Sequence, residues 1–283
     1  MAETSGAHTQ AVWCLVGAAT LWSLGGLLIK WIDWHPLAIA ATRSAIAAAT
    51  LALLLPRFRF SFSAVQWGAA ACYVGTVALF VTATKLTTAA NAIFLQYTAP
   101  VYIALFGAWF LNEKPTRVDA LLILLALGGV ALFFVDQISF TGLWGNVAAL
   151  GSGVSFAGLT VLLRKQKDGS PADSVLLGNL FTALVFLPFA VRSAPGQGSW
   201  LGLVLLGVFQ LGLSYVLFTK GIRHVRALEA SLLSMIEPVL NPIWVLLALG
   251  ERPQFWAIVG GILVIAAATI RGVLTARAAQ IPR

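Results

Sequence analysis

The fold is decided by two stretches, AIFLQYTAPVYIALFGAWFLNEKP (residues 92–115) and ASLLSMIEPVLNPIWVLLALGERP (residues 230–253). Both are apolar, both carry a proline in the same place, and both close on Glu-x-Pro. The matched pairs are Ala92 and Ala230, Leu95 and Leu233, Pro100 and Pro238, Glu113 and Glu251, and Pro115 and Pro253, each 138 positions apart. Several matches in one register indicate that the second stretch is a copy of the first.

The composition indicates that the chain resides in a lipid bilayer. Hydrophobic residues make up 59% of it, charged residues 10%, and the mean hydropathy is +0.90. Soluble domains carry about 25% charged residues, so this chain lacks the polar surface that water requires. The net charge is +8, but the basic residues fall between apolar runs, which favours a membrane surface over a nucleic acid as the partner. Cys14 and Cys72 lack metal-ligand spacing, so we expect neither a metal nor a cofactor.

A membrane-spanning helix needs about 20 mostly apolar residues, and the chain contains ten such segments. They cover residues 11–30, 36–55, 66–84, 88–111, 117–135, 142–163, 173–191, 200–219, 227–249 and 254–271. The first ten residues contain no Lys or Arg, so we expect the first segment to be a retained helix and not a cleaved signal. The expected fold class is therefore all-α integral membrane, with ten transmembrane helices.

The copied unit holds five segments, in residues 1–140 and 141–283. The first and sixth segments also correspond, at an offset of 134: Gly17 matches Gly151, Trp22 matches Phe156, and Lys30 matches Arg164. Because five is odd, the second copy must enter the membrane upside down. The sequence thus predicts two inverted five-helix repeats, an architecture common among transporters.

Lys and Arg fall mainly on one side of the expected membrane. That side holds Arg57, Arg59, Lys114, Arg117, Arg164, Lys165, Lys167, Lys220, Arg223, Arg226, Arg271, Arg277 and Arg283, whereas the other holds Lys30, Lys85, Arg192 and Arg252. Short cytoplasmic loops carry an excess of Lys and Arg. We therefore expect a multi-pass protein of the bacterial inner membrane with both termini in the cytoplasm.

The paired Glu-x-Pro stretches, the chain length and the charge pattern together resemble the EamA-type exporters of the drug/metabolite transporter superfamily. The resemblance covers about residues 12–135 and 142–272. It implies a bundle around a central cavity lined by helices one, three, four, six, eight and nine, with helices five and ten at the periphery. Within the superfamily, the length and the aromatic-rich segments look most like the bacterial aromatic amino-acid exporters.

The charged residues that lie more than one turn inside an expected span are Glu237 and Arg43, at depths where a charge costs about 2.5–3.5 kcal/mol on insertion scales. Glu237 precedes Pro238, which leaves the carbonyl of Ser234 without its helical donor, and Asn241 continues this polar patch. Glu237 is our candidate for binding a substrate ammonium and for proton coupling; the alternative is a protonated carboxyl bonded to a neighbouring helix. Arg43 is expected to reach the interface or to form a structural ion pair, with a carboxylate clamp as the functional alternative.

Polar and aromatic side chains supply the other candidate substrate contacts. Gln96 and Tyr97 are adjacent and cannot face the same way on a regular helix, so we expect at most one of them at the centre. Rings with polar tips suit an amphipathic solute, although ordinary helix packing explains them equally well. The further candidates are Trp22, Tyr73, Phe80, Phe156, Gln210 and Tyr215.

These features favour a secondary exporter over an enzyme or a channel. Neither HExxH nor a paired-Asp motif is present in the sequence, and rings of charge or repeated filter loops are also missing. The sequence has no GxxxxGK[ST] loop for nucleotides, so transport would run on the substrate gradient or on protons through Glu237. We expect aromatic or broadly neutral amino acids as substrates, with quaternary cations and drugs as the alternative. We expect lipid around the chain and a monomer as its oligomeric state.

Overall fold

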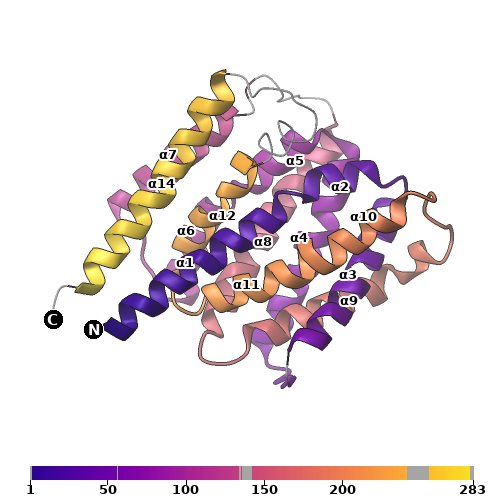
Figure 1. Cartoon of the computed structure of the whole chain (residues 1–283), viewed down its shortest axis with the longest axis horizontal. Helices are drawn as coiled ribbons and strands as arrows, with labels where there is room; N and C mark the ends of the chain where they lie inside the picture. The colour runs from indigo at the N-terminus through magenta and orange to yellow at the C-terminus, as the bar shows by residue number, and fades with distance from the viewer. Residues whose placement is uncertain (1, 56, 134, 136–141, 241–254, 281–283) are drawn as a thin grey trace.

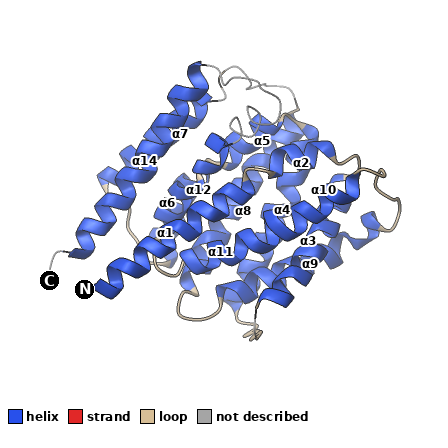
Figure 2. Ribbon diagram, in the orientation of Figure 1, coloured by secondary structure: helices blue, strands red, loops and turns tan. Residues whose placement is uncertain are grey.

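The computed structural model describes residues 2–55, 57–133, 135, 142–240 and 255–280. Within these residues the regular structure is helical throughout (Figure 2). The first half contains α1 (Ala2–Trp22), α2 (Gly25–Trp31), α3 (Pro36–Leu54), α4 (Ala64–Leu86), α5 (Ala89–Gln96), α6 (Ala99–Phe110) and α7 (Arg117–Phe133). The second half contains α8 (Leu143–Lys165), α9 (Pro171–Ala190), α10 (Ser199–Leu205), the π-helix η1 (Leu206–Leu213), α11 (Ser214–Gly221), α12 (Ala227–Ser234) and α14 (Phe255–Gln280).

Eight stretches of the described residues are long and apolar enough to cross a membrane. They are Gly6–Trp31, Pro36–Leu54, Ala64–Leu86, Ala89–Phe110, Leu143–Lys165, Pro171–Ala190, Ser199–Gly221 and Phe255–Thr275. They match eight of the ten expected segments to within a few residues. The fifth, which corresponds to the 17-residue α7, and the ninth, which extends beyond the described residues, stay predictions as membrane spans.

Side-chain caps begin several of these helices. Ser63 accepts a hydrogen bond from the backbone N–H of Gln66 at the start of α4, and Thr88 accepts one from Asn91 at the start of α5. Thr116 and Asp119 form a reciprocal capping box before α7, each side chain accepting from the other's backbone N–H. These caps satisfy N–H groups that have no partner inside the helix.

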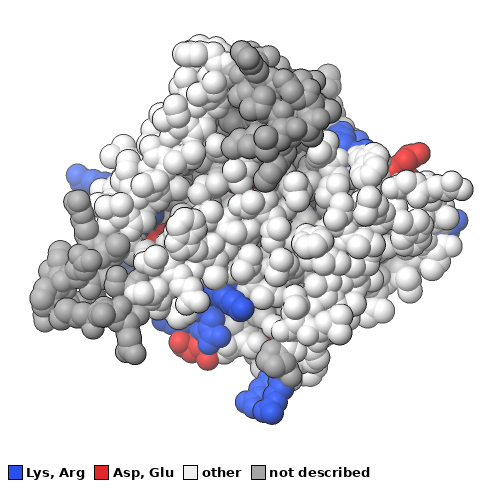
Figure 3. Space-filling view, in the orientation of Figure 1, with Lys and Arg blue, Asp and Glu red and all other residues white. Residues whose placement is uncertain are grey.

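Both termini lie at one end of the bundle, which we call the N/C end; the opposite end is the far end (Figure 1). α4 packs along α8 and α3 along α9, so each half of the chain contributes to the centre. α7 and α14 pair with each other at the edge of the bundle (Figure 1), as the resemblance implied for the fifth and tenth helices. On the face in Figure 3, charged side chains lie toward the two ends and a broad uncharged band separates them.

Two lysines close the ends of neighbouring helices at the far end. Lys30 donates from Nζ to the carbonyl of Thr87 at 2.9 Å. Lys85 donates in return to the carbonyl of Ile32 at 2.5 Å. Each cation thus satisfies a carbonyl at the C-terminal end of the other helix, where the helix dipole also favours positive charge.

The same reciprocal contact recurs at the N/C end. Arg164 donates from Nη1 to the carbonyls of Ile222 and Arg223 at 3.1 and 2.6 Å. Arg223 donates from Nε to the carbonyl of Lys167 at 2.8 Å. The sequence repeat pairs Arg164 with Lys30, at the offset of 134. It also pairs Arg223 with Lys85, which lies 138 positions earlier, the offset of the two Glu-x-Pro stretches.

The N/C end also carries an ion-pair network that joins the two halves of the chain. Glu113, after α6, accepts from Arg164 Nε at 3.2 Å and from the backbone N–H of Ala227 at 3.0 Å. Arg226 Nε lies 3.9 Å from the same carboxylate. Beside it, Asp119 pairs with Arg271 at 2.8 Å. The network holds the start of α12 against the end of α6.

Candidate functional site

A small cavity lies at the centre of the bundle, with a volume of about 40 Å³. It is lined by Trp22, Arg43, Thr76, Val77, Phe80, Gln96, Tyr97, Phe156, Gln210, Leu211, Tyr215 and Glu237. These residues come from both halves of the chain. Ligand pockets have volumes of about 300–1,000 Å³, so the helices must part before a metabolite can enter.

Four irregular helical segments surround this cavity. The first span is broken between α1 and α2, the fourth between α5 and α6, and the stretch after α12 at Met235, while the eighth contains η1. π-Helical segments and discontinuous helices are frequent at binding sites because they redirect side chains and free backbone groups. Three helix breaks and one π-helix therefore lie around the cavity in the described structure.

The break between α5 and α6 brings both Gln96 and Tyr97 to the cavity, so the expectation that at most one of them reaches the centre is wrong. α5 ends at Gln96, and after a turn α6 begins at Ala99, with Pro100 in its first turn. Gly153 of α8 lies against this break, with Gln96 O 2.9 Å from where a Cβ would lie. Gln96 donates to Ser152 Oγ at 2.7 Å, and the turn lets Tyr97 point to the opposite half.

Glu237 lies at the cavity in a buried position, with 6% of its surface exposed. The hydroxyl of Tyr97 lies 2.5 Å from Glu237 Oε2 and 2.8 Å from the carbonyl oxygen of Ser234. That carbonyl is the one deprived of its helical donor by Pro238. A single tyrosine hydroxyl thus connects the carboxyl group to the unwound backbone beside it.

Arg43 lies at the cavity and not at the membrane interface, so the expectation that it reaches the interface is wrong. It is 1% exposed, near the middle of α3. Nη1 donates to Gln210 Oε1 at 3.1 Å and Nη2 to the carbonyl of Val77 at 3.3 Å, whereas Nε has no hydrogen-bond partner. The described residues place no carboxylate within 4.0 Å of it, so the expected structural ion pair does not form there.

The π-helix η1 presents Gln210 to Arg43. Its wider turn brings Gly207 so close to α3 that an added Cβ would lie 2.5 Å from Ile46 Cβ and 2.9 Å from Arg43 O. Gln210 also packs against Gly25, at the break after α1. No pattern in the sequence indicates this π-helix. It carries Gln210 and packs at Gly207 against α3, the helix that carries Arg43.

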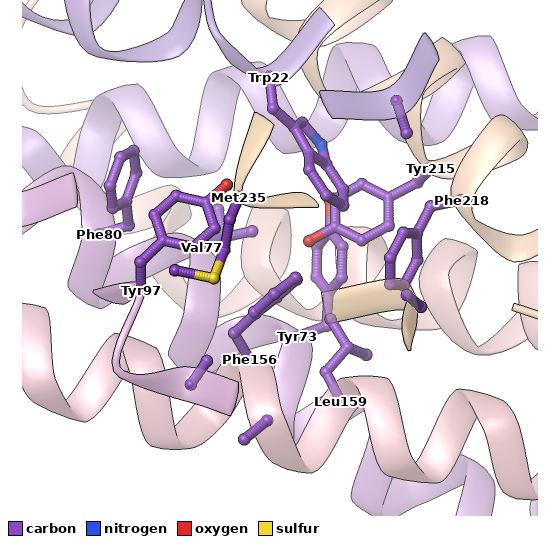
Figure 4. Close-up of a cluster of buried hydrophobic side chains, with 14 of the residues drawn as sticks. Trp22, Tyr73, Val77, Phe80, Tyr97, Phe156, Leu159, Tyr215, Phe218 and Met235 are labelled. Atoms are coloured by element: carbon purple, nitrogen blue, oxygen red, sulfur yellow. The ribbon is translucent and has the colours of Figure 1, made fainter. Parts of the chain in front are cut away.

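Aromatic rings form one wall of the cavity (Figure 4). The Trp22 ring lies 5.2 Å from that of Tyr215 and 5.8 Å from that of Phe156, both in edge-on contacts. Phe80 also lines the cavity, on the side of Tyr97 (Figure 4). Tyr73 stands behind this wall: its ring contacts Tyr215 at 5.0 Å and its hydroxyl donates to Asn179.

The structure thus brings together eight of the ten candidate residues on the cavity wall, places Tyr73 behind it, and leaves Asn241 outside the described residues. It adds Arg43, from the second span, which the resemblance did not place on the lining. A buried guanidinium, a buried carboxyl group and several rings can together hold a solute that carries charge and an apolar group.

Known proteins with similar sequences are transporters. An uncharacterised transporter of Archaeoglobus fulgidus is 28% identical over 196 residues, which cover 69% of this chain and 71% of that protein. The pseudopaline exporter CntI of Pseudomonas aeruginosa is 30% identical over 187 residues, covering 63% and 64%. Human solute carrier family 35 member G1 is 27% identical over 197 residues, covering 62% and 53%.

Structural comparison agrees on the fold. A crystal structure aligns with 97% of this chain and 100% of its own, with a TM-score of 0.79 at 21% sequence identity. That identity supports a shared fold alone. The sequence profile of the EamA-like transporter family matches residues 9–135 and 143–271, nearly the whole chain in two copies. The chain therefore belongs to the EamA-like transporter family of multi-pass membrane proteins.

Proposed function

We propose that the chain is a secondary transporter that exports aromatic or broadly neutral amino acids across the bacterial inner membrane by alternating access. The observation that carries the proposal is the central cavity, which both Glu237 and the ring of Trp22 line. A carboxyl group can pair with an ammonium, and rings can bind an apolar or aromatic side chain. The relative named an exporter supports the outward direction.

The alternating mechanism rests on two inverted five-helix repeats, residues 1–140 and 141–283. The reciprocal cation–carbonyl contacts support this proposal, because residues paired by the sequence repeat make them at opposite ends of the bundle. The N/C end, which we assign to the cytoplasm, carries the additional Glu113 network. The described structure is then a state whose cytoplasmic end is held closed and whose cavity is too small for substrate. The described lining residues come from both halves of a single chain, which supports a monomer as the working unit.

Proton coupling through Glu237 is the second part of the proposal. A hydroxyl carries one proton, so Tyr97 can donate to the Ser234 carbonyl or to Glu237, but not to both. All partners are satisfied when Tyr97 donates to Ser234 and a protonated Glu237 donates to Tyr97. A substrate ammonium would replace that proton on the carboxyl group, so that one proton moves inward as one substrate moves outward. Among the described residues, the other titratable or charged groups that line this cavity are Arg43 and Tyr215.

Transport in liposomes reconstituted with purified protein tests the proposal. Labelled phenylalanine and a labelled quaternary ammonium are each offered to folded protein. Saturable phenylalanine uptake that other neutral amino acids compete with supports amino-acid export. Uptake of the quaternary cation alone contradicts it and favours the alternative, a multidrug or quaternary-cation exporter, because one carboxyl group among rings also suits such cations.

A further inference from the structure

Arg43 carries a positive charge in the middle of a membrane-spanning helix that the described structure does not neutralise. Its side chain is 1% exposed, and ionisable groups at membrane depth are expensive unless paired. The two hydrogen bonds that it makes go to neutral oxygens, on Gln210 and Val77. Glu237 lines the same cavity, but the two do not form an ion pair within 4.0 Å.

The guanidinium is also held with one donor unused. Nε is buried and has no partner, although arginine presents its N–H groups in a fixed fork that suits the two oxygens of a carboxylate. The fork is held in place: η1 packs directly on the backbone of α3 at Gly207, and Gln210 accepts from Nη1. In the described structure, the Arg43 guanidinium thus lies on the cavity wall with an unpaired charge and an N–H donor without a partner. Such a group can bind an anion.

We propose that Arg43 binds the carboxylate of the transported molecule, so that the cavity selects substrates bearing a carboxylate. The inference rests on the proposed transport function and specifies its substrate class. A zwitterion then fits the whole cavity: its carboxylate pairs with Arg43, its ammonium pairs with deprotonated Glu237, and its side chain meets the rings around Trp22. Binding neutralises a buried charge that stays unpaired in the empty state.

Competition on the wild-type protein tests this without any mutation. Binding of labelled phenylalanine is measured against phenylalaninamide and phenethylamine, which lack the carboxylate, and against 3-phenylpropionate, which lacks the ammonium. We expect phenylalanine and 3-phenylpropionate to compete, and the two compounds without a carboxylate to compete at least about tenfold less well, because charge-assisted hydrogen bonds are the strong ones. Equal competition by phenethylamine overturns the role of Arg43 while leaving amino-acid transport intact.

The other outcomes separate this inference from the proposed function. Saturable direct binding of labelled 3-phenylpropionate, without binding of phenylalanine, supports Arg43 and overturns amino-acid export. Binding of a quaternary cation alone overturns both. Two variants then place the effect: Arg43→Gln should raise the KM for phenylalanine about tenfold or more and leave phenethylamine competition unchanged. Arg43→Lys, which keeps the charge but loses the fork, should lie between Arg43→Gln and wild type. A KM for phenylalanine that is unchanged in folded Arg43→Gln protein contradicts the assignment.

Discussion

Replacing Tyr97 by phenylalanine tests the hydrogen bonds that join the two broken helices. The change removes one hydroxyl and keeps the ring, so packing against the cavity is preserved. Two oxygens lose their partner, the Ser234 carbonyl at 2.8 Å and Glu237 Oε2 at 2.5 Å. Side-chain hydrogen bonds within membranes contribute about 0.6 kcal/mol on average and up to about 1.7. Two of them, one to a carbonyl without a helical donor, give an expected loss of about 1–3 kcal/mol in the free energy of unfolding.

Equilibrium unfolding in detergent micelles or bicelles measures this loss. Tyr102→Phe is the matched control, because it deletes the same hydroxyl in α6 from a half-buried residue packed against the core, and we expect it to change stability by a few tenths of a kcal/mol. The double variant Tyr97→Phe with Glu237→Gln should lose less than the sum of the single variants, since both changes break one contact. Equal losses for Tyr97→Phe and Tyr102→Phe would refute the account of this linkage.

Two further changes probe the packing and the N/C end. Gly207→Ala should lower the free energy of unfolding by about 1–3 kcal/mol, because the added Cβ would lie 2.5 Å from Ile46 Cβ. Gly128→Ala is the control: Gly128 has open space around it, so its free energy of unfolding should stay the same or rise by up to about 1 kcal/mol. Equal effects of the two would contradict the close approach of η1 and α3. Glu113→Gln removes partners of Arg164 and Arg226 and should favour opening at the N/C end by up to about fivefold, since such pairs contribute at most about 1 kcal/mol. The rate of thiol labelling at Thr76→Cys, in a Cys14→Ala and Cys72→Ala background, reports that opening. Asp168→Asn is its control, and a rate that Glu113→Gln leaves unchanged would argue against a closing role for the network.

The sequence carried most of the information about the helices. Hydrophobic length and proline position located eight spans, because both follow directly from bilayer thickness and backbone chemistry. Pro238 also predicted a free carbonyl at Ser234, and the structure shows which side chain bonds to it. The repeat placed Trp22 and Phe156 at equivalent positions, and their rings meet in the cavity.

The positions of Gln96, Tyr97 and Arg43 at the cavity depend on helix breaks and distant contacts, which the local sequence does not indicate. Gln96 and Tyr97 both reach the cavity because the helix breaks between them, whereas the prediction assumed a regular helix. The sequence favours the interface or a structural ion pair for Arg43, with a carboxylate clamp as the alternative. Its hydrogen-bond partner Gln210 lies 167 positions away in the chain, so no local pattern indicates that contact. The π-helix that aligns Gln210 has no recognisable sequence signal here, so its contribution to the site could not be anticipated.

The most direct test of the account is phenylalanine transport driven by a pH gradient, in liposomes containing wild-type protein or Glu237→Gln. The account predicts that an acidic lumen drives accumulation by the wild type, since each outgoing proton exchanges for an incoming substrate. Glu237→Gln should lose this response to the gradient, because the amide cannot carry the proton. A gradient response that persists in Glu237→Gln, or no phenylalanine transport by folded wild-type protein, would contradict the central claim.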